Sequence, residues 1–70
     1  MKKIKLSDAK EMQMREPKVR DMKNVSHITN DFEKEITLIS NLCQKTPNEI
    51  EELSMSDFAK LDKALQDFLL

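Results

Sequence analysis

The chain of 70 residues contains no glycine, tryptophan or tyrosine, and it has a single cysteine, Cys43, and a single histidine, His27. One cysteine cannot form a disulfide within the chain, and a lone thiol is typical of a reducing compartment, so we interpret Cys43 as a small buried hydrophobe. His27 has no Cys or His at the spacing of metal ligands. We therefore expect neither a metal site nor a cofactor.

Groups for catalysis are also scarce. Catalysis needs a positioned acid–base pair or an activated nucleophile, and His27 with Cys43 is the pair to consider. A predicted helix of about fifteen residues lies between them and would hold its ends roughly 20 Å apart. We therefore expect that the protein is not an enzyme and that it acts through a binding surface.

Long apolar runs are absent as well, because the longest contain two or three residues, too few to span a membrane. The first residues, MKKIKL, include lysines but lack the long apolar region and the small-residue cleavage site of a signal peptide. We expect a cytosolic protein that does not contact membranes.

Charge is unevenly distributed, although the net charge is only −1. Residues 1–25 contain eight basic and four acidic residues, a balance of +4, whereas residues 26–70 contain four basic and nine acidic residues, a balance of −5. Such runs are commonly solvated faces, and the alternative is that the basic half of one copy faces the acidic half of a neighbour or partner. Nucleic-acid binding is disfavoured, because the whole chain is slightly acidic and has no Trp or Tyr to stack on a base.

Two stretches near the N-terminus alternate between apolar and polar residues, which is the pattern of a strand. The apolar residues, on either side of residues 7–10, are Ile4, Leu6, Met12 and Met14. Because tight two-residue turns favour glycine and the chain has none, we expect a four-residue loop at 7–10. Residues 1–16 are thus a possible β-hairpin.

From Pro17 onward the pattern is helical. Pro17 suits the first position of a short helix, whose apolar residues at spacings of three are Val19, Met22 and Val25. Asn30 with Glu33 is typical of a capping box and begins the strongest predicted helix, which ends near Lys45. The apolar stripe of that helix consists of Phe32, Ile36, Ile39 and Cys43, with Leu38 and Leu42 on one flank.

Thr46, Pro47 and Glu49 place three helix-start signals together, so a further short helix follows. Ser54 or Ser56 then caps a last helix. These patterns predict a mainly α fold (α+β if the hairpin forms), with three or four short helices over residues 17–70, in one small domain of residues 1–70. A core of that size supplies about 3–5 kcal/mol of stability, and self-association or a partner would add to it.

The last helix carries an apolar stripe close to the 3.6-residue period. One interpretation is that this stripe completes the core of the monomer. The other is that part of it stays exposed as a partner groove or a dimer interface, a role that five flexible methionines also suit. We predict that the partner-binding residues are Phe58, Leu61, Leu65, Phe68 and Leu69.

Three segments, in order, carry a resemblance to a known family. An EP-x-x-x-D-(M/L) segment is matched by Glu16, Pro17, Asp21 and Met22. A helix ending in Leu-(Thr/Cys) is matched by Leu42 and Cys43. A (T/S)-x-x-E-(L/I)-x-x-L-x-x-x-D-(F/Y) run is matched by Thr46, Glu49, Ile50, Leu53, Asp57 and Phe58. From about Ile4 to Leu69 the chain thus resembles the tail assembly chaperones of Mu-like contractile-tailed phages and prophages, and it departs from them in a hairpin loop without glycine.

The resemblance implies a non-enzymatic protein in the cytoplasm of a bacterial host, which binds the tape measure protein of the tail and keeps it soluble during assembly. The tail tube protein is a second candidate partner. Two alternatives stay open. A homo-oligomerisation module would cover its apolar faces with other copies of itself. A small DNA-acting prophage regulator would need one basic surface formed by Lys2, Lys3, Lys5, Arg15, Lys18 and Arg20.

Overall fold

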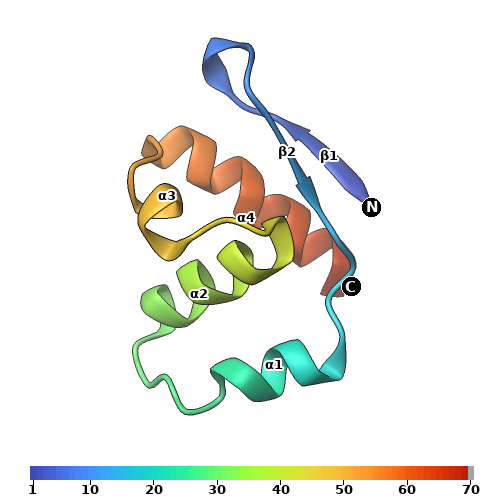
Figure 1. Ribbon diagram of the computed structural model, residues 1–70, viewed down its shortest axis with the longest axis vertical. Helices are drawn as coiled ribbons and strands as arrows, with labels where there is room; N and C mark the ends of the chain where they lie inside the picture. Colours follow the sequence, from blue (N-terminus) through green and yellow to red (C-terminus); the bar gives the residue numbers. More distant parts are fainter. Residues whose placement is uncertain (70) are drawn as a thin grey trace.

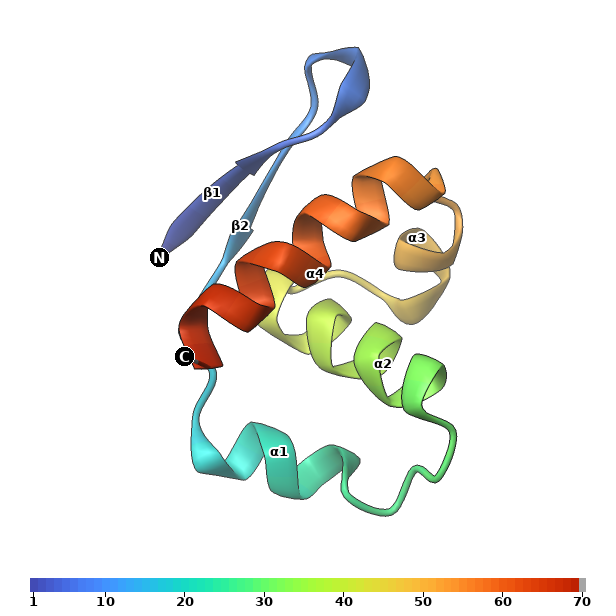
Figure 2. The same ribbon diagram turned by 180° about the vertical axis from the view of Figure 1, so that it is seen from behind.

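The computed structural model describes residues 1–69, without the side chain of Asp8 (Figures 1 and 2). Within these residues an antiparallel two-stranded hairpin is followed by four helices, which confirms the predicted architecture. Residue 70, the last of the predicted helical range, lies outside the described residues. The elements are β1 (Lys2–Lys5), the 3₁₀ turn η1 (Ser7–Ala9), β2 (Glu11–Met14), α1 (Val19–Val25), α2 (Asp31–Cys43), α3 (Pro47–Glu51) and α4 (Met55–Leu69).

The hairpin pairs Ile4 with Met12, and its inner face is apolar, as the alternation predicted. Its loop has three residues rather than four, and the Leu6 N–H closes it by donating to the Lys10 carbonyl at 2.7 Å. Such a loop needs a left-handed residue at its last position, usually glycine. Ala9 takes this role with φ 60°, a conformation that costs a residue with a Cβ roughly 1–2 kcal/mol.

The first helix differs from the prediction in where it begins. It begins at Val19 rather than at Pro17, and of its three apolar residues only Val25 is buried. Val19 is 87% exposed and Met22 is exposed, whereas Asp21 and Val25 are buried. Residues four apart share a helix face, so a helix anchored through Asp21 turns Val25 inward and Val19 and Met22 outward.

The later helices begin where the capping signals predicted. The Asn30 side chain accepts the Glu33 N–H at 3.0 Å, and the Ser54 hydroxyl accepts the Asp57 N–H at 3.2 Å. At the start of α3, both bonds of the capping box are present, between Thr46 and Glu49. Helix α2 ends at Cys43, two residues before the predicted end, because Gln44 turns left-handed with φ 56°.

One cluster of buried apolar side chains joins the hairpin to the helices. Helix α4 lies between the hairpin and α2, so its apolar stripe contacts elements on both sides (Figure 2). Figure 1 shows α1 at the opposite end of the molecule from the hairpin loop. The buried cluster consists of Ile4, Leu6, Met14, Val25, Leu38, Ile39, Leu42, Cys43, Ile50, Phe58, Leu61, Ala64 and Leu65.

Candidate functional site

The five residues predicted to bind a partner lie along α4, and the structure separates them into two groups. Phe58, Leu61 and Leu65 are buried in the core. Phe68 is partly buried, with the Lys2 ammonium 5.4 Å from the centre of its ring, and Leu69 is 49% exposed. In this conformation only the C-terminal pair and the edge of Phe58 are accessible, so the central part of the stripe belongs to the monomer core.

A different apolar surface is exposed where the start of α2 meets α3 and the start of α4. Phe32, in the first turn of α2, is 50% exposed, and Met55, the first residue of α4, is 71% exposed. Ile28, Ile36 and Leu53 are partly buried beside them. We call this set the Phe32 surface, and it consists of Ile28, Phe32, Ile36, Leu53, Met55 and the edge of Phe58.

Two shallow grooves run over the Phe32 surface. One, of about 370 Å³, extends from Ile28 to Pro47, and the other, of about 240 Å³, extends from Phe32 to Met55. The rings of Phe32 and Phe58 meet edge to face at 5.4 Å, which fixes the position of the exposed ring. Glu33 and Glu51 line the same grooves, so the apolar floor has an acidic border.

Sequence reasoning assigned Phe32 to the core because it continues the apolar stripe of α2. The stripe is longer than the part of α2 that other elements cover: the apolar residues from Leu38 onward are buried, whereas Phe32 is not. Phe32 is the second residue of α2, two residues after the Asn30 cap, so the capping signal places it in the first turn of the helix.

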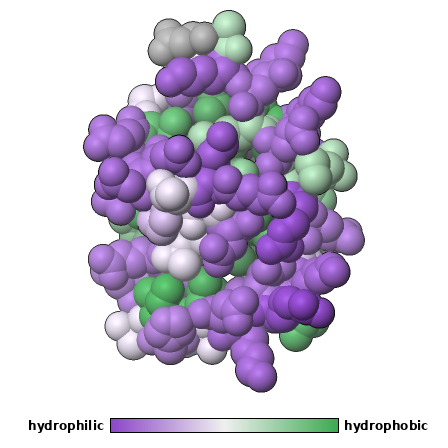
Figure 3. All heavy atoms as spheres, viewed as in Figure 1, coloured by the Kyte–Doolittle hydropathy of each residue, from purple (hydrophilic) through white to green (hydrophobic). Residues whose placement is uncertain are grey.

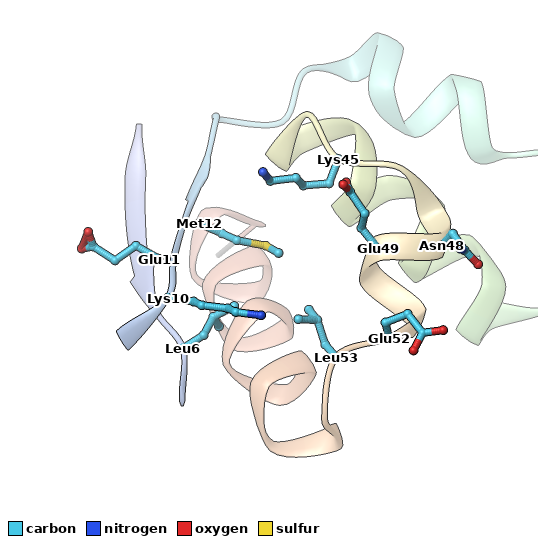
Figure 4. Close-up of a pocket in the computed structure, with 9 residues that line it drawn as sticks. All are labelled: Leu6, Lys10, Glu11, Met12, Lys45, Asn48, Glu49, Glu52 and Leu53. Carbon is cyan, nitrogen blue, oxygen red and sulfur yellow. The ribbon is translucent and has the colours of Figure 1, made fainter. Parts of the chain in front are cut away.

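A second hollow lies between β2 and α3, with a volume of about 460 Å³ (Figure 4). Met12 from the hairpin and Leu53 from the chain after α3 point towards each other across it. The ammonium groups of Lys10 and Lys45 also extend over this space, whereas Glu11 points away from it (Figure 4). We call this hollow the hairpin groove.

Two buried aspartates hold the hairpin in place. Asp57 accepts the Ser7 N–H at 3.0 Å and the Ser7 hydroxyl at 2.8 Å, which joins the hairpin loop to the start of α4. These bonds from Ser7 lower the pKa of Asp57. Asp21 accepts hydrogen bonds from both terminal nitrogens of Arg15, at 2.8 and 2.7 Å, and from the Lys18 N–H at 2.7 Å. The bonds from Arg15 are the main cause that lowers the pKa of Asp21 to about 2. Both carboxylates are therefore fully charged and structurally engaged at neutral pH.

The remaining candidate groups do not gather into a site. Cys43 is buried, and burial raises the pKa of its thiol, whereas His27 is exposed. Among residues 1–69, no group of three or more His, Cys, Asp or Glu side chains is placed to hold a metal ion. Of the six basic residues that DNA binding would need, Lys2 pairs with Asp67 at 3.2 Å and Arg15 with Asp21 at 2.7 Å. No helix in the described part of the chain combines the length and apolarity needed to cross a bilayer.

Most of the face seen in Figure 3 is hydrophilic, with apolar atoms showing between the charged side chains as separate patches.

Comparison with known proteins gives one match. The family model for phage tail assembly chaperone proteins, E, or 41 or 14, matches residues 3–70, nearly the whole chain. No curated protein and no solved structure matched. The chain therefore belongs to the family of phage tail assembly chaperone proteins, E, or 41 or 14.

Proposed function

We propose that this chain keeps the tape measure protein of a phage tail soluble during assembly by binding an amphipathic helix of that protein on the Phe32 surface. Membership in the tail assembly chaperone family supports a role in tail assembly. The observation that carries the proposal is the exposure of two large apolar side chains, Phe32 and Met55, beside adjoining grooves. Exposed apolar patches of this kind mark sites of protein interaction. The role is non-enzymatic and is carried out in the cytoplasm of the bacterial host.

The chemistry of the grooves specifies the kind of helix that fits. An amphipathic helix presents apolar residues at i, i+3 or i+4 and i+7, which can lie along an apolar groove such as the one beside Phe32. Glu33 and Glu51 border the grooves, so Lys or Arg residues on the flanks of the helix would complement them. Burying the exposed half of Phe32 contributes about 1 kcal/mol, so several such contacts give binding that remains reversible.

Of the five partner-binding residues predicted on α4, only some contribute directly to binding in this proposal. Phe58 supports the exposed ring of Phe32 and contributes its edge to the Phe32 surface. Leu61 and Leu65 lie in the core, where they act on binding only through the fold. Phe68 and Leu69, at the far end of α4, offer a second and smaller contact to the same partner.

The test is co-expression with the tape measure protein encoded in the same tail gene cluster, followed by size-exclusion chromatography. The informative variant carries Phe32→Asp and Met55→Asp, and the matched control is Val19→Asp, an exposed apolar residue on α1, away from both grooves. We expect a soluble complex with the unmodified chain and with the control, and an insoluble tape measure protein with the double variant. A folded double variant that still forms the complex would overturn this assignment.

The same experiment separates the alternatives. A tape measure protein that stays insoluble with the unmodified chain, together with a stable oligomer of the chain alone, would favour the homo-oligomerisation module. Binding of the tail tube protein instead, lost in the double variant, would keep the surface and change the partner.

A further inference from the structure

The hairpin groove is bordered by an unpaired strand edge. In an antiparallel pair, residues alternate between those whose backbone groups bond the partner strand and those whose groups point away. The Leu6–Lys10 bond and the register show that the backbone N–H and C=O groups of residues 10, 12 and 14 point towards β1. The N–H and C=O of Glu11, Gln13 and Arg15 therefore point away from β1.

The direction of this outer edge follows from a bond at its end. The Arg15 N–H donates to the Leu42 carbonyl at 3.1 Å, so the outer edge of β2 faces the C-terminal end of α2 and, beyond it, α3. Figure 4 shows the same arrangement, with β2 between β1 and the groove. Within the described residues, the backbone groups of Glu11 and Gln13 make no hydrogen bond to another backbone group outside the hairpin. Both residues are exposed, so these groups are accessible to another chain.

Two adjoining hollows lie along this edge. The hairpin groove meets Lys10, Glu11 and Met12, and a second hollow of about 250 Å³ continues along Glu11, Met12, Gln13 and Arg15. Together they follow the four residues of β2, Glu11–Met14, over roughly 13 Å. The floor is apolar, formed by Leu6, Met12 and Leu53.

We infer that the outer edge of β2 binds an extended peptide segment of another protein, which adds a third strand to the hairpin and lies in the hairpin groove. The unpaired N–H and C=O groups specify an extended backbone, because a helix has already used its own. The floor specifies alternate apolar side chains directed at Met12 and Leu53. Glu49 and Glu52 line the groove on the α3 side together with Lys45, whereas Lys10 extends over it from the hairpin and has no ion-pair partner among the described residues. Lys10 therefore favours an Asp or Glu in the segment beside its apolar residues.

This site is distinct from the Phe32 surface in residues and in mode of binding, and it does not depend on the proposed function. The Phe32 surface binds a helix through side chains alone. The hairpin groove binds a strand through backbone groups, with side chains selecting the sequence. One partner with a helix and an adjoining extended segment, or two partners, can occupy both.

The test uses a displayed library of random peptides of about ten residues, long enough to span the edge. We expect enrichment of peptides in which apolar residues alternate with polar ones and at least one residue is acidic. The informative variant is Gln13→Pro, which removes one outward N–H, a change that edge strands tolerate. The matched control is Lys3→Pro, because Lys3 lies directly opposite Gln13 and its N–H points away on the other side of the hairpin.

Gln13→Pro should weaken the selected peptides at least tenfold, and Lys3→Pro should leave their affinity within twofold. In the unmodified chain, the amide signals of Glu11 and Gln13 should shift on titration and become protected from hydrogen exchange. Equal affinity for both proline variants, or no enrichment, would overturn the inference.

A charge-reversed variant keeps the inference testable if Gln13→Pro does not fold. Lys10→Glu with Lys45→Glu leaves every backbone group of the hairpin in place. It should select peptides with Lys or Arg in place of Asp or Glu. Selection of the same acidic peptides would exclude these lysines from recognition.

Discussion

The carboxylate of Asp21 is the most informative single group to remove, because it joins the exit of the hairpin to the start of α1. It binds Arg15 after the hairpin through two bonds of 2.8 and 2.7 Å, and it caps α1 through the Lys18 N–H at 2.7 Å. Asp21→Asn keeps the shape of the side chain and removes its charge. The amide has one acceptor oxygen, and each oxygen of Asp21 accepts from Arg15, so in either orientation the NH₂ group of Asn faces a nitrogen of Arg15, which is also a donor.

The expected loss can be worked out from the charge pair. A pKa of about 2 in place of the ordinary 3.8 corresponds to roughly 2 kcal/mol of stabilisation by the charged form. The Arg15 side chain is 34% exposed, and water screens its side of the pair. We therefore expect Asp21→Asn to lower the free energy of unfolding at pH 7 by about 1–2 kcal/mol, a large share of the roughly 3–5 kcal/mol that a core of this size supplies.

The stabilisation by Asp21 depends on pH in a direction that follows from its lowered pKa. The pKa of Asp21 is lower in the folded state than in the unfolded state, so its contribution is complete above the ordinary pKa of about 4. The contribution is lost as the pH falls from about 4 to about 2. The difference in stability between the unmodified chain and Asp21→Asn should therefore be constant from pH 5 to pH 7 and close to zero near pH 2.

Urea unfolding followed by circular dichroism measures this difference at each pH. With a slope of about 1 kcal/mol per molar urea, typical of a small domain, the midpoint at pH 7 should fall by about 1–2 M. Glu16→Gln is the control, because Glu16 is an exposed carboxylate five residues away, and it should shift the midpoint by less than about 0.5 M. Equal shifts for Asp21→Asn and Glu16→Gln at pH 7 would refute the reasoning.

Three further predictions follow from single positions. Ala9→Gly should raise the free energy of unfolding by about 0.5–1 kcal/mol, because a residue with a Cβ is disfavoured at φ 60°. A lower urea midpoint for this variant would contradict the left-handed conformation of residue 9. Leu65→Asp should leave the chain largely unfolded by circular dichroism, because it buries an unpaired charge in the core, so its loss of binding would report on folding alone. Cys43 should react slowly with a disulfide reagent at pH 7 and at least tenfold faster in urea, because it is buried and its pKa is raised; equal rates would place the thiol at the surface.

Features set by neighbouring residues could be predicted from the sequence. The Asn30 and Ser54 caps and the capping box at Thr46 formed as expected, because each is a bond between residues three apart. Of the capping box predicted at Asn30 and Glu33, only the bond to the Asn30 side chain forms. The hairpin formed for a similar reason, since strict alternation and a short connection favour local pairing. Fold class therefore followed from local patterns.

The exposed surface could not be predicted in the same way, because exposure depends on which elements meet. The stripes of α1 and α2 are similar in pattern, but Val25 and Leu38 are covered and Val19 and Phe32 are not. The Ser7–Asp57 bonds join residues that are fifty apart in the sequence, and no local sequence pattern predicts them. The α4 stripe illustrates the consequence: its spacing indicated an apolar face correctly, but only the position of the hairpin and α2 shows that Leu61 and Leu65 face inward.

The two aspartates that match the family pattern have the same physical task at opposite ends of the hairpin. Asp57 fixes its loop to α4, and Asp21 fixes its exit to α1. A two-stranded hairpin is marginally stable alone, so these attachments hold β2 beside α3 with the groove between them. Phe32, Met55 and Met12 lie outside the matched positions, whereas Leu53 and Phe58, which also line these surfaces, lie within them. The matched positions therefore include both attachments of the hairpin and part of the surfaces, and the two most exposed side chains of the Phe32 surface, Phe32 and Met55, lie beside them.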